Sequence, residues 1–352
     1  MKIDLLTHKI SKHFSIHPSR RKTLAAMIFG LLSSSNVHQQ SLARYVDSPN
    51  PAAALRRVER FFSEEPLATE DYAKAIVELL AFNGKFDLCL DRSNWKFGDK
   101  DINYLVLSWR INKKISVPLL FVDLDKAGNS NTTERIDLLE EFNKIFGFHR
   151  IKSLMADREF IGKKWFRMLD QNKIPYFVRV KENTLLPWGR DHPIHANQLF
   201  HHLQEGQSRI VEKEMYGGVV YFAGTRSKAA DLVIVMSNQD LNAKQILDKY
   251  RERWSIEELF RKLKTSGFHW ENTHMKRSER LVSLLIILGF GLLIAYLMGQ
   301  EDSIPWKKTL SCTLYSVFKQ GLINFQFLLA KSLTEAIKTI LHLLERAQNV
   351  IF

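Results

Sequence analysis

The N-terminal part of the chain has apolar positions at the spacing of helices. Residues 23–33 form an apolar segment, and Ser41 is placed to cap a short helix over 41–46. Asn50 and Pro51 form a capping residue followed by a first-turn proline, which predicts a helix over 52–62. Its arginines lie apart from its apolar side, so the region suits either contact with DNA or an ordinary solvated basic face.

From about residue 85 the pattern changes to short apolar runs bounded by polar residues, which is typical of strands. The expected order is three strands, helix, strand, helix, strand, at 86–90, 104–109, 115–124, 132–145, 151–156, 160–169 and 175–180. Thr132 or Thr133 would cap the first of these helices. This order predicts an α/β fold with a mixed sheet and helices on its faces.

Residues 183–231 interrupt this rhythm with prolines, a Gly217-Gly218 turn and short alternating runs, which predicts a mostly β insertion. The run at 232–236 then returns to the main sheet, and a long helix is expected over 241–265. The predicted regions are helical 1–82, α/β core 83–182, β-rich 183–231, core with a long helix 232–300, and helical 301–352.

One uncharged run, 281–298, is about long enough to span a bilayer. A helix enclosed by a large core has the same pattern. The run occurs once and the rest of the chain is highly charged, so we expect a buried core helix and no membrane.

Two aspartates, Asp91 and Asp157, follow apolar runs directly, where predicted strands end. Taken singly, such an aspartate is more often a turn residue, and Asp123 and Asp125 share the feature. Several converging carboxylates would suit a divalent metal site for phosphodiester chemistry.

The long helix predicted at 241–265 carries a more specific pattern. Tyr250, Arg253, Glu257 and Lys264 fall within an arc of about 60° at about 100° per residue. A carboxylate flanked by a phenol, a guanidinium and an ammonium suits a site that holds metal and phosphate together. The alternative is a solvent-exposed helix in which Arg253 and Glu257 form a routine i,i+4 pair, while Glu258 points elsewhere.

Charge and cysteine content narrow the function classes. The formal net charge of +13 favours polyanionic partners, with nucleic acid first. The two cysteines, Cys89 and Cys312, are too few for a disulfide framework or a cysteine zinc site. The first residues lack a signal-peptide core, so a cytoplasmic location is expected.

These residues resemble a known family. The motif DREF at 157–160 and the spacing Y-x2-R-x3-E-x6-K from Tyr250 to Lys264 look like the DDE transposases of bacterial insertion sequences, specifically the IS-four family with the Y-R-E-K signature. The resemblance covers roughly 85–300 and implies an RNase H-like fold. It also implies Asp91, Asp157 and Glu257 as catalytic and metal-binding residues, with the remaining signature residues contacting DNA.

The resemblance further implies two Mg²⁺ or Mn²⁺ ions, double-stranded DNA as substrate, a homodimer in the synaptic complex, and cut-and-paste transposition near the bacterial nucleoid. Some relatives stack a flipped base on a tryptophan, and Trp188 is a candidate. A catalytically silent DNA-binding descendant is the main alternative, but it should have lost one acid, and all three are present.

Overall fold

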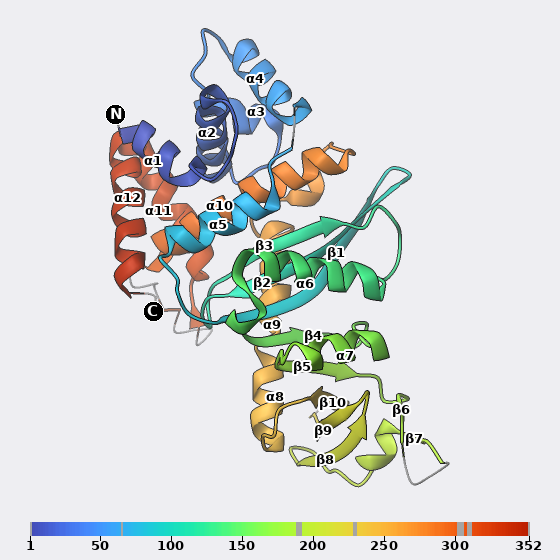
Figure 1. Cartoon of the computed structure of the whole chain (residues 1–352). Coiled ribbons are helices and arrows are strands. Elements are labelled where there is room, and N and C mark those ends of the chain that lie inside the picture. Colours follow the sequence, from blue (N-terminus) through green and yellow to red (C-terminus); the bar gives the residue numbers. More distant parts are fainter. Residues whose placement is uncertain are drawn as a thin grey trace.

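A mixed sheet of eight strands forms the centre of the protein (Figure 1). The computed structural model describes residues 2–64, 66–187, 192–227, 231–300, 306–307 and 312–350. The strands lie in the order β3-β2-β1-β4-β5-β10-β9-β8. They are β1 (Phe86–Phe97), β2 (Lys100–Arg110), β3 (Ser116–Asp123), β4 (Ile151–Ala156), β5 (Tyr176–Val180), β8 (Ser208–Met215), β9 (Gly218–Arg226) and β10 (Leu232–Ser237).

Strands β1, β4 and β5 are parallel, and the outer strands on both sides are antiparallel. The predicted mixed sheet is therefore confirmed. Strands β8 and β9, expected as part of an insertion, extend this same sheet through β10. Two further pairs are short: β6 (Leu185–Leu186) with β7 (Ile194–His195), and β11 (Trp306–Lys307) with β12 (Cys312–Thr313).

Helices cover both faces of the sheet. In Figure 1, α6 (Thr132–Phe146) and α7 (Lys163–Gln171) lie in front of it, and α8 (Ala243–Arg251) and α9 (Trp254–Leu263) lie behind it. The cap of α6 is Asn131 rather than Thr132 or Thr133, because Asn131 and Glu134 form a reciprocal capping box.

The two ends of the chain pack together as a helical region beside β3. It contains α1 (Lys2–Ser11), α2 (Pro18–Ser34), α3 (Gln39–Leu42), α4 (Pro51–Ser63), α5 (Thr69–Leu79), α11 (Val317–Lys331) and α12 (Leu333–Val350). The Asn50 cap is confirmed, since its side chain accepts from the Ala53 amide at 2.9 Å. The cap predicted at Ser41 is wrong, because α3 begins at Gln39, after the extended residue His38.

Helix α10 (Ser278–Gln300) is the core of this region, in contact with α2, α11, α12 and β3. It is apolar and long enough to cross a membrane, yet 94% of its most apolar window is buried inside the protein. Burial therefore accounts for its composition, as expected. Gly299 and Gly321 let α10 and α11 touch, because a Cβ on Gly321 would lie 1.6 Å from the Ala295 carbonyl oxygen.

Two elements near the predicted site differ from expectation. Strand β1 continues past Asp91 to Phe97, because β2 pairs with it along its whole length. The long helix is two helices, α8 and α9, joined by a tight turn at Glu252 and Arg253. The amides of Glu252 and Arg253 bond to carbonyls three residues back, on Lys249 and Tyr250, so the turn is 3₁₀-like.

A candidate active site

The sheet brings two aspartates from distant parts of the chain side by side. Strands β1 and β4 are parallel neighbours, with Leu90 opposite Ala156 as their last pair. Asp91 and Asp157 follow these two residues directly. Neighbouring strands lie about 4.8 Å apart, so the two carboxyl groups start from adjacent backbone positions. Asp91 thus marks the end of the pairing with β4 rather than the end of its strand.

The turn between α8 and α9 adds three more functional groups to the same place. Arg253 donates one guanidinium nitrogen to Asp91, at 3.0 Å, and another to Glu257. The Tyr250 hydroxyl donates to Asp157 at 3.3 Å. All three predicted acids are therefore contacted by one tyrosine and one arginine that lie a single turn apart.

Burial and charge make Asp91 an unusual carboxyl group. Burial raises the pKa of Asp91 to about 6, and the neighbouring carboxylates of Asp157 and Glu159 act in the same direction. Arg253 and the Arg92 amide, which donates to Asp91 at 2.8 Å, lower that pKa but do not cancel the effect. Burial likewise raises the pKa of the Tyr250 phenol to about 12, so Tyr250 is a donor at neutral pH.

The donor set fits a hard divalent cation in its chemistry. Carboxylate oxygens are the ligands that Mg²⁺ and Mn²⁺ prefer, and a cation, the Arg253 guanidinium, already lies between Asp91 and Glu257. In this arrangement, the described residues contain no group of three Asp, Glu, His or Cys side chains that lie close enough together to hold a metal ion. Metal binding would therefore require Arg253 to leave at least one of its two carboxylates.

Lys264 is placed apart from the three acids. It is the residue after α9, and its ammonium group pairs with Glu271 at 2.8 Å and donates to the Asn94 carbonyl at 3.1 Å. Lys264 nevertheless contacts the same strand as Arg253, at Asn94 and Asp91 respectively, so the predicted single arc of four residues stays a prediction. The role of Lys264 as a DNA contact also stays a prediction, and Trp188 lies outside the described residues.

Sequence reasoning missed the charged residues that hold these elements. Asp87 on β1 pairs with Lys249 of α8 at 2.6 Å, Lys249 pairs with Glu252, and Glu252 pairs with Arg110 of β2. This chain of ion pairs fastens the turn between α8 and α9 to the sheet. The available signal was Asp87 itself, a charge within an apolar run, which needs a partner when it is buried.

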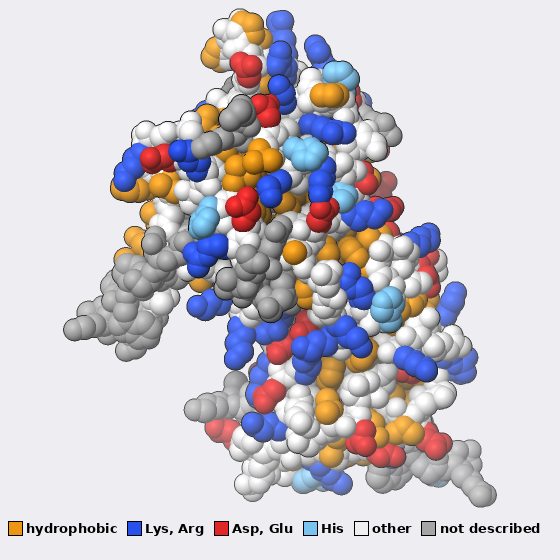
Figure 2. Space-filling view, turned by 60° about the vertical axis from the view of Figure 1, so that its left-hand side comes forward, with side chains coloured by type: hydrophobic (Ala, Val, Ile, Leu, Met, Phe, Trp, Pro, Cys, Tyr) orange, Lys and Arg blue, Asp and Glu red, His pale blue; other side chains and the backbone are white. Residues whose placement is uncertain are grey.

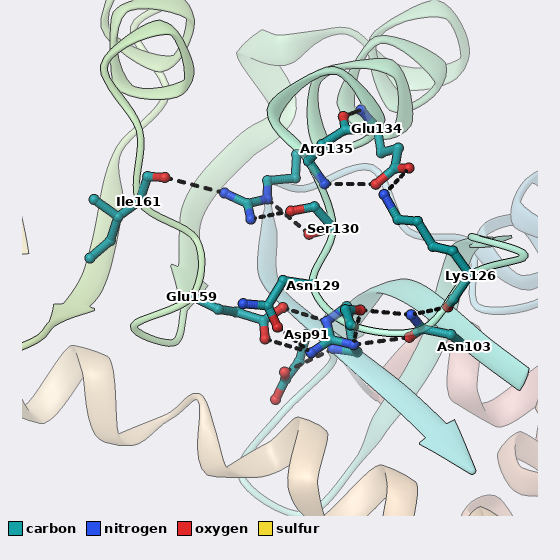
Figure 3. A network of polar contacts seen from close by, with 12 residues as sticks. Asp91, Asn103, Lys126, Asn129, Ser130, Glu134, Arg135, Glu159 and Ile161 are labelled. Carbon is teal, nitrogen blue, oxygen red and sulfur yellow. Dashed lines mark hydrogen bonds and ion pairs between the residues drawn. The ribbon is translucent and has the colours of Figure 1, made fainter. Parts of the chain in front are cut away.

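A second missed pair joins Arg92, the residue after Asp91, to Glu159, which lies two residues after Asp157. The Arg92 guanidinium binds both carboxylate oxygens of Glu159, at 2.6 and 2.8 Å. In Figure 3, Glu159 and Asn129 come from different loops and lie beside Asp91. The available signal was the DREF motif, which contains Glu159, although nothing in that motif points to Arg92.

An open cavity of about 740 Å³ adjoins one of the three acids, Glu257. Glu257 and Tyr250 line it, and Trp254, whose relative exposure is 61%, stands at its edge. Four arginines also line it: Arg179, Arg226, Arg251 and Arg253. Guanidinium groups bind phosphate oxygens well, so the cavity suits a phosphodiester that approaches the carboxylates.

Comparison with known proteins identifies the family. Residues 115–298, just over half of the chain, match the transposase DDE domain. The chain belongs to this family. Family membership supports a transposase function that acts on DNA, and such transposases generally use divalent metals. The matched range contains Asp157, Glu257 and the residues of the signature, whereas Asp91 lies before it.

No curated protein matches the chain. Among solved structures it is similar to the piggyBac transposase in a synaptic complex with hairpin DNA, at 11% identity and a TM-score of 0.45. That match covers 99% of this chain and 85% of the piggyBac chain. So distant a likeness says nothing about individual residues of the site.

Proposed function

We propose that the transposase cleaves DNA at the ends of an insertion sequence and joins the freed ends to target DNA, in cut-and-paste transposition. Asp91, Asp157 and Glu257 are its catalytic carboxylates, and it belongs to the IS-four group. The Y-x2-R-x3-E-x6-K spacing supports this subgroup. The parallel strands β1, β4 and β5, flanked by antiparallel strands and by helices on both faces, support an RNase H-like core.

The observation that carries the proposal is the arrangement around Arg253. Asp91, Asp157 and Glu257 come from three distant segments, yet Arg253 and Tyr250 contact all of them. Asp91 and Asp157 lie 162 and 93 positions away from the signature residues that contact them, so the fold and not the local sequence brings these groups together. Perturbed carboxyl groups such as Asp91 also concentrate at functional sites.

Each residue has a distinct role in this proposal. Two Mg²⁺ or Mn²⁺ ions held by the carboxylates would supply the charge that activates the attacking hydroxyl and stabilises the leaving oxygen. Arg253 and Tyr250 turn toward the phosphate oxygens of the cleaved strand and orient them. Lys264, about 10 Å further along β1 at Asn94, contacts a neighbouring phosphate.

The DNA would extend from the acids to the N-terminal helices. A groove of about 590 Å³ lies between α3, α4 and the segment before α10. Lys276, Arg277 and Arg280 line it, together with one carboxylate, Glu59. On the face in Figure 2, Lys and Arg side chains outnumber carboxylates. Both features support backbone binding that weakens with salt.

Cleavage of two ends in coordination needs two active sites, so the working form is a homodimer on DNA. Terminal-repeat sequence is read by the N-terminal helical region, residues 1–82, whereas the scattered cations supply affinity without sequence preference.

The test uses DNA that carries the terminal sequences flanking the coding region, with Mg²⁺ present. Wild type should cleave it, and Asp157→Ala and Glu257→Ala should bind it without cleaving. Glu258→Ala is the matched control, because Glu258 pairs with Arg261 and Lys262 away from the acids. Cleavage that survives the loss of Asp157 or Glu257 would overturn the site. A chain that binds the ends but never cleaves them would be the silent descendant.

A further inference from the structure

The loop that begins with Asp157 has no strand partner to hold it. Asp157 is the first residue after β4, and the irregular segment that follows extends to α7. A second irregular segment, 124–131, follows β3 and lies beside it. The ladder of the sheet fixes the backbone as far as Ala156, and the direction in which the Asp157 carboxylate points depends on the contacts of the loop that follows.

Arg92 supplies the largest set of these contacts. Besides the two bonds to Glu159, it donates to the Gly128 carbonyl at 2.7 Å, to Asn129 at 2.8 Å and to Asn103 at 3.1 Å. These bonds use all three nitrogens of the guanidinium group. The Arg92 and Glu159 side chains are only 13% and 19% exposed, so solvent screens the pair weakly.

Arg92 also acts on Asp91 through its backbone. Its amide donates to one carboxylate oxygen of Asp91. Successive side chains of a strand point to opposite faces of the sheet, so the Arg92 side chain lies on the other face from Asp91 and reaches the two loops. One residue thus orients the carboxylate of Asp91 and fastens the loop that starts with Asp157. We propose that the pair of Arg92 and Glu159, here called the clasp, sets the distance between the carboxylate groups of Asp91 and Asp157. It thereby positions both carboxylates for metal binding. This inference rests on the proposed function of the two aspartates.

The rest of the network keeps the loops folded without the clasp (Figure 3). Phe160 is fully buried, with Arg135 over its ring at 5.0 Å. Arg135 also donates to the Ile161 carbonyl and to Ser130, and Asn103 holds the carbonyls of Lys126 and Gly128. Loss of the clasp should therefore shift Asp157 by a small amount and leave the fold intact.

A small shift matters because Mg²⁺ demands near-ideal octahedral geometry. Substitution of residues that orient metal ligands typically costs 10- to 100-fold in metal affinity or activity. We expect Arg92→Lys and Glu159→Gln each to raise the Mg²⁺ concentration for half-maximal cleavage by at least about tenfold. Arg92→Lys keeps the charge, but an ammonium group cannot bind both Glu159 oxygens and three further acceptors.

The experiment measures three quantities on the full chain: cleavage as a function of Mg²⁺ concentration, binding of Mn²⁺ by calorimetry in the presence of DNA, and the melting temperature. Lys126→Gln is the matched control, because it removes the 2.6 Å ion pair to Glu134 in the same network and touches neither aspartate nor Glu159. The double variant Arg92→Lys, Glu159→Gln should lose no more metal affinity than Arg92→Lys alone, since both substitutions break the same pair.

The clasp is supported if cleavage needs more Mg²⁺ and Mn²⁺ binds more weakly in the clasp variants, while their melting temperatures stay near that of wild type. A lowered melting temperature with an unchanged metal requirement would make the pair purely structural and overturn the inference. Clasp variants that behave like Lys126→Gln would also overturn it, while loss of cleavage in Asp157→Ala would leave the proposed function standing. If wild type itself shows no metal-dependent cleavage, the proposed function fails instead.

Discussion

Asp91→Asn should make the metal-free transposase more stable above pH 6. The ionised Asp91 carboxylate is only 20% exposed and lies near other carboxylates, and Arg253 compensates for this only in part. Asparagine has nearly the same shape and carries no charge. Its side-chain oxygen can still accept from Arg253, so the substitution removes the cost of a buried charge and keeps a hydrogen bond.

The magnitude follows from the pKa of Asp91, which rises from 3.8 to about 6 on folding. Because the folded state holds this proton more tightly, the stabilisation from Asp91 is complete below pH 4 and is lost as the pH rises through 6. At about 1.4 kcal/mol per pKa unit, the loss is about 3 kcal/mol. For a chain of this length that corresponds to a melting temperature about 4 °C higher in the variant.

The assay is thermal or urea denaturation between pH 4 and pH 8 with EDTA present. The two proteins should be nearly equal at pH 4 and diverge as the pH rises. Asp125→Asn is the control, because the Asp125 side chain is 76% exposed and its loss should change little. A variant less stable than wild type at pH 8, or a difference independent of pH, would refute this account of the buried carboxylate.

Two further predictions follow from the same structure. Arg253→Gln should bind Mn²⁺ more tightly than wild type without DNA, because the guanidinium no longer competes for Asp91 and Glu257. Arg251→Gln is the control, because the partner of Arg251 is the exposed Asp248, and its Mn²⁺ affinity should equal that of wild type. Equal Mn²⁺ affinities of the two variants would contradict this prediction. Gly321→Ala should lower the free energy of unfolding by about 3 kcal/mol or more through its clash with α10. Gly218→Ala, which meets open space, should stay within about 0.5 kcal/mol of wild type in urea denaturation.

Much of the fold could be predicted because its elements have local signals. Strands β4 and β10 and the Asn50 cap were placed to within a residue, since apolar runs and capping residues act over a few positions. The end of β1 was not, because its second half is mostly polar and has β2 as its strand partner there. The sequence of one strand does not show which other strand pairs with it.

The turn between α8 and α9 shows the same limit at the site. The sequence 241–265 has an uninterrupted helical pattern, and Glu252 and Arg253 both keep right-handed helical dihedral angles. Only their hydrogen bonds shift to carbonyls three residues back. The partners that accompany this turn, Asp87 and Asp91, lie more than 160 positions away in the chain. A prediction from periodicity could find the signature residues but not the direction in which the turn aims them.

The positions of the two aspartates depend on different physical constraints. Asp91 lies within a strand paired to β2, so its backbone is fixed by the ladder of the sheet. Asp157 lies just outside β4 and depends on Glu159, Phe160 and their partners. Loops change conformation at a lower free-energy cost than central strands. When DNA and metal bind, the adjustment that brings the carboxylates together should therefore come from Asp157 and from Arg253, while Asp91 stays in place as the fixed point of the site.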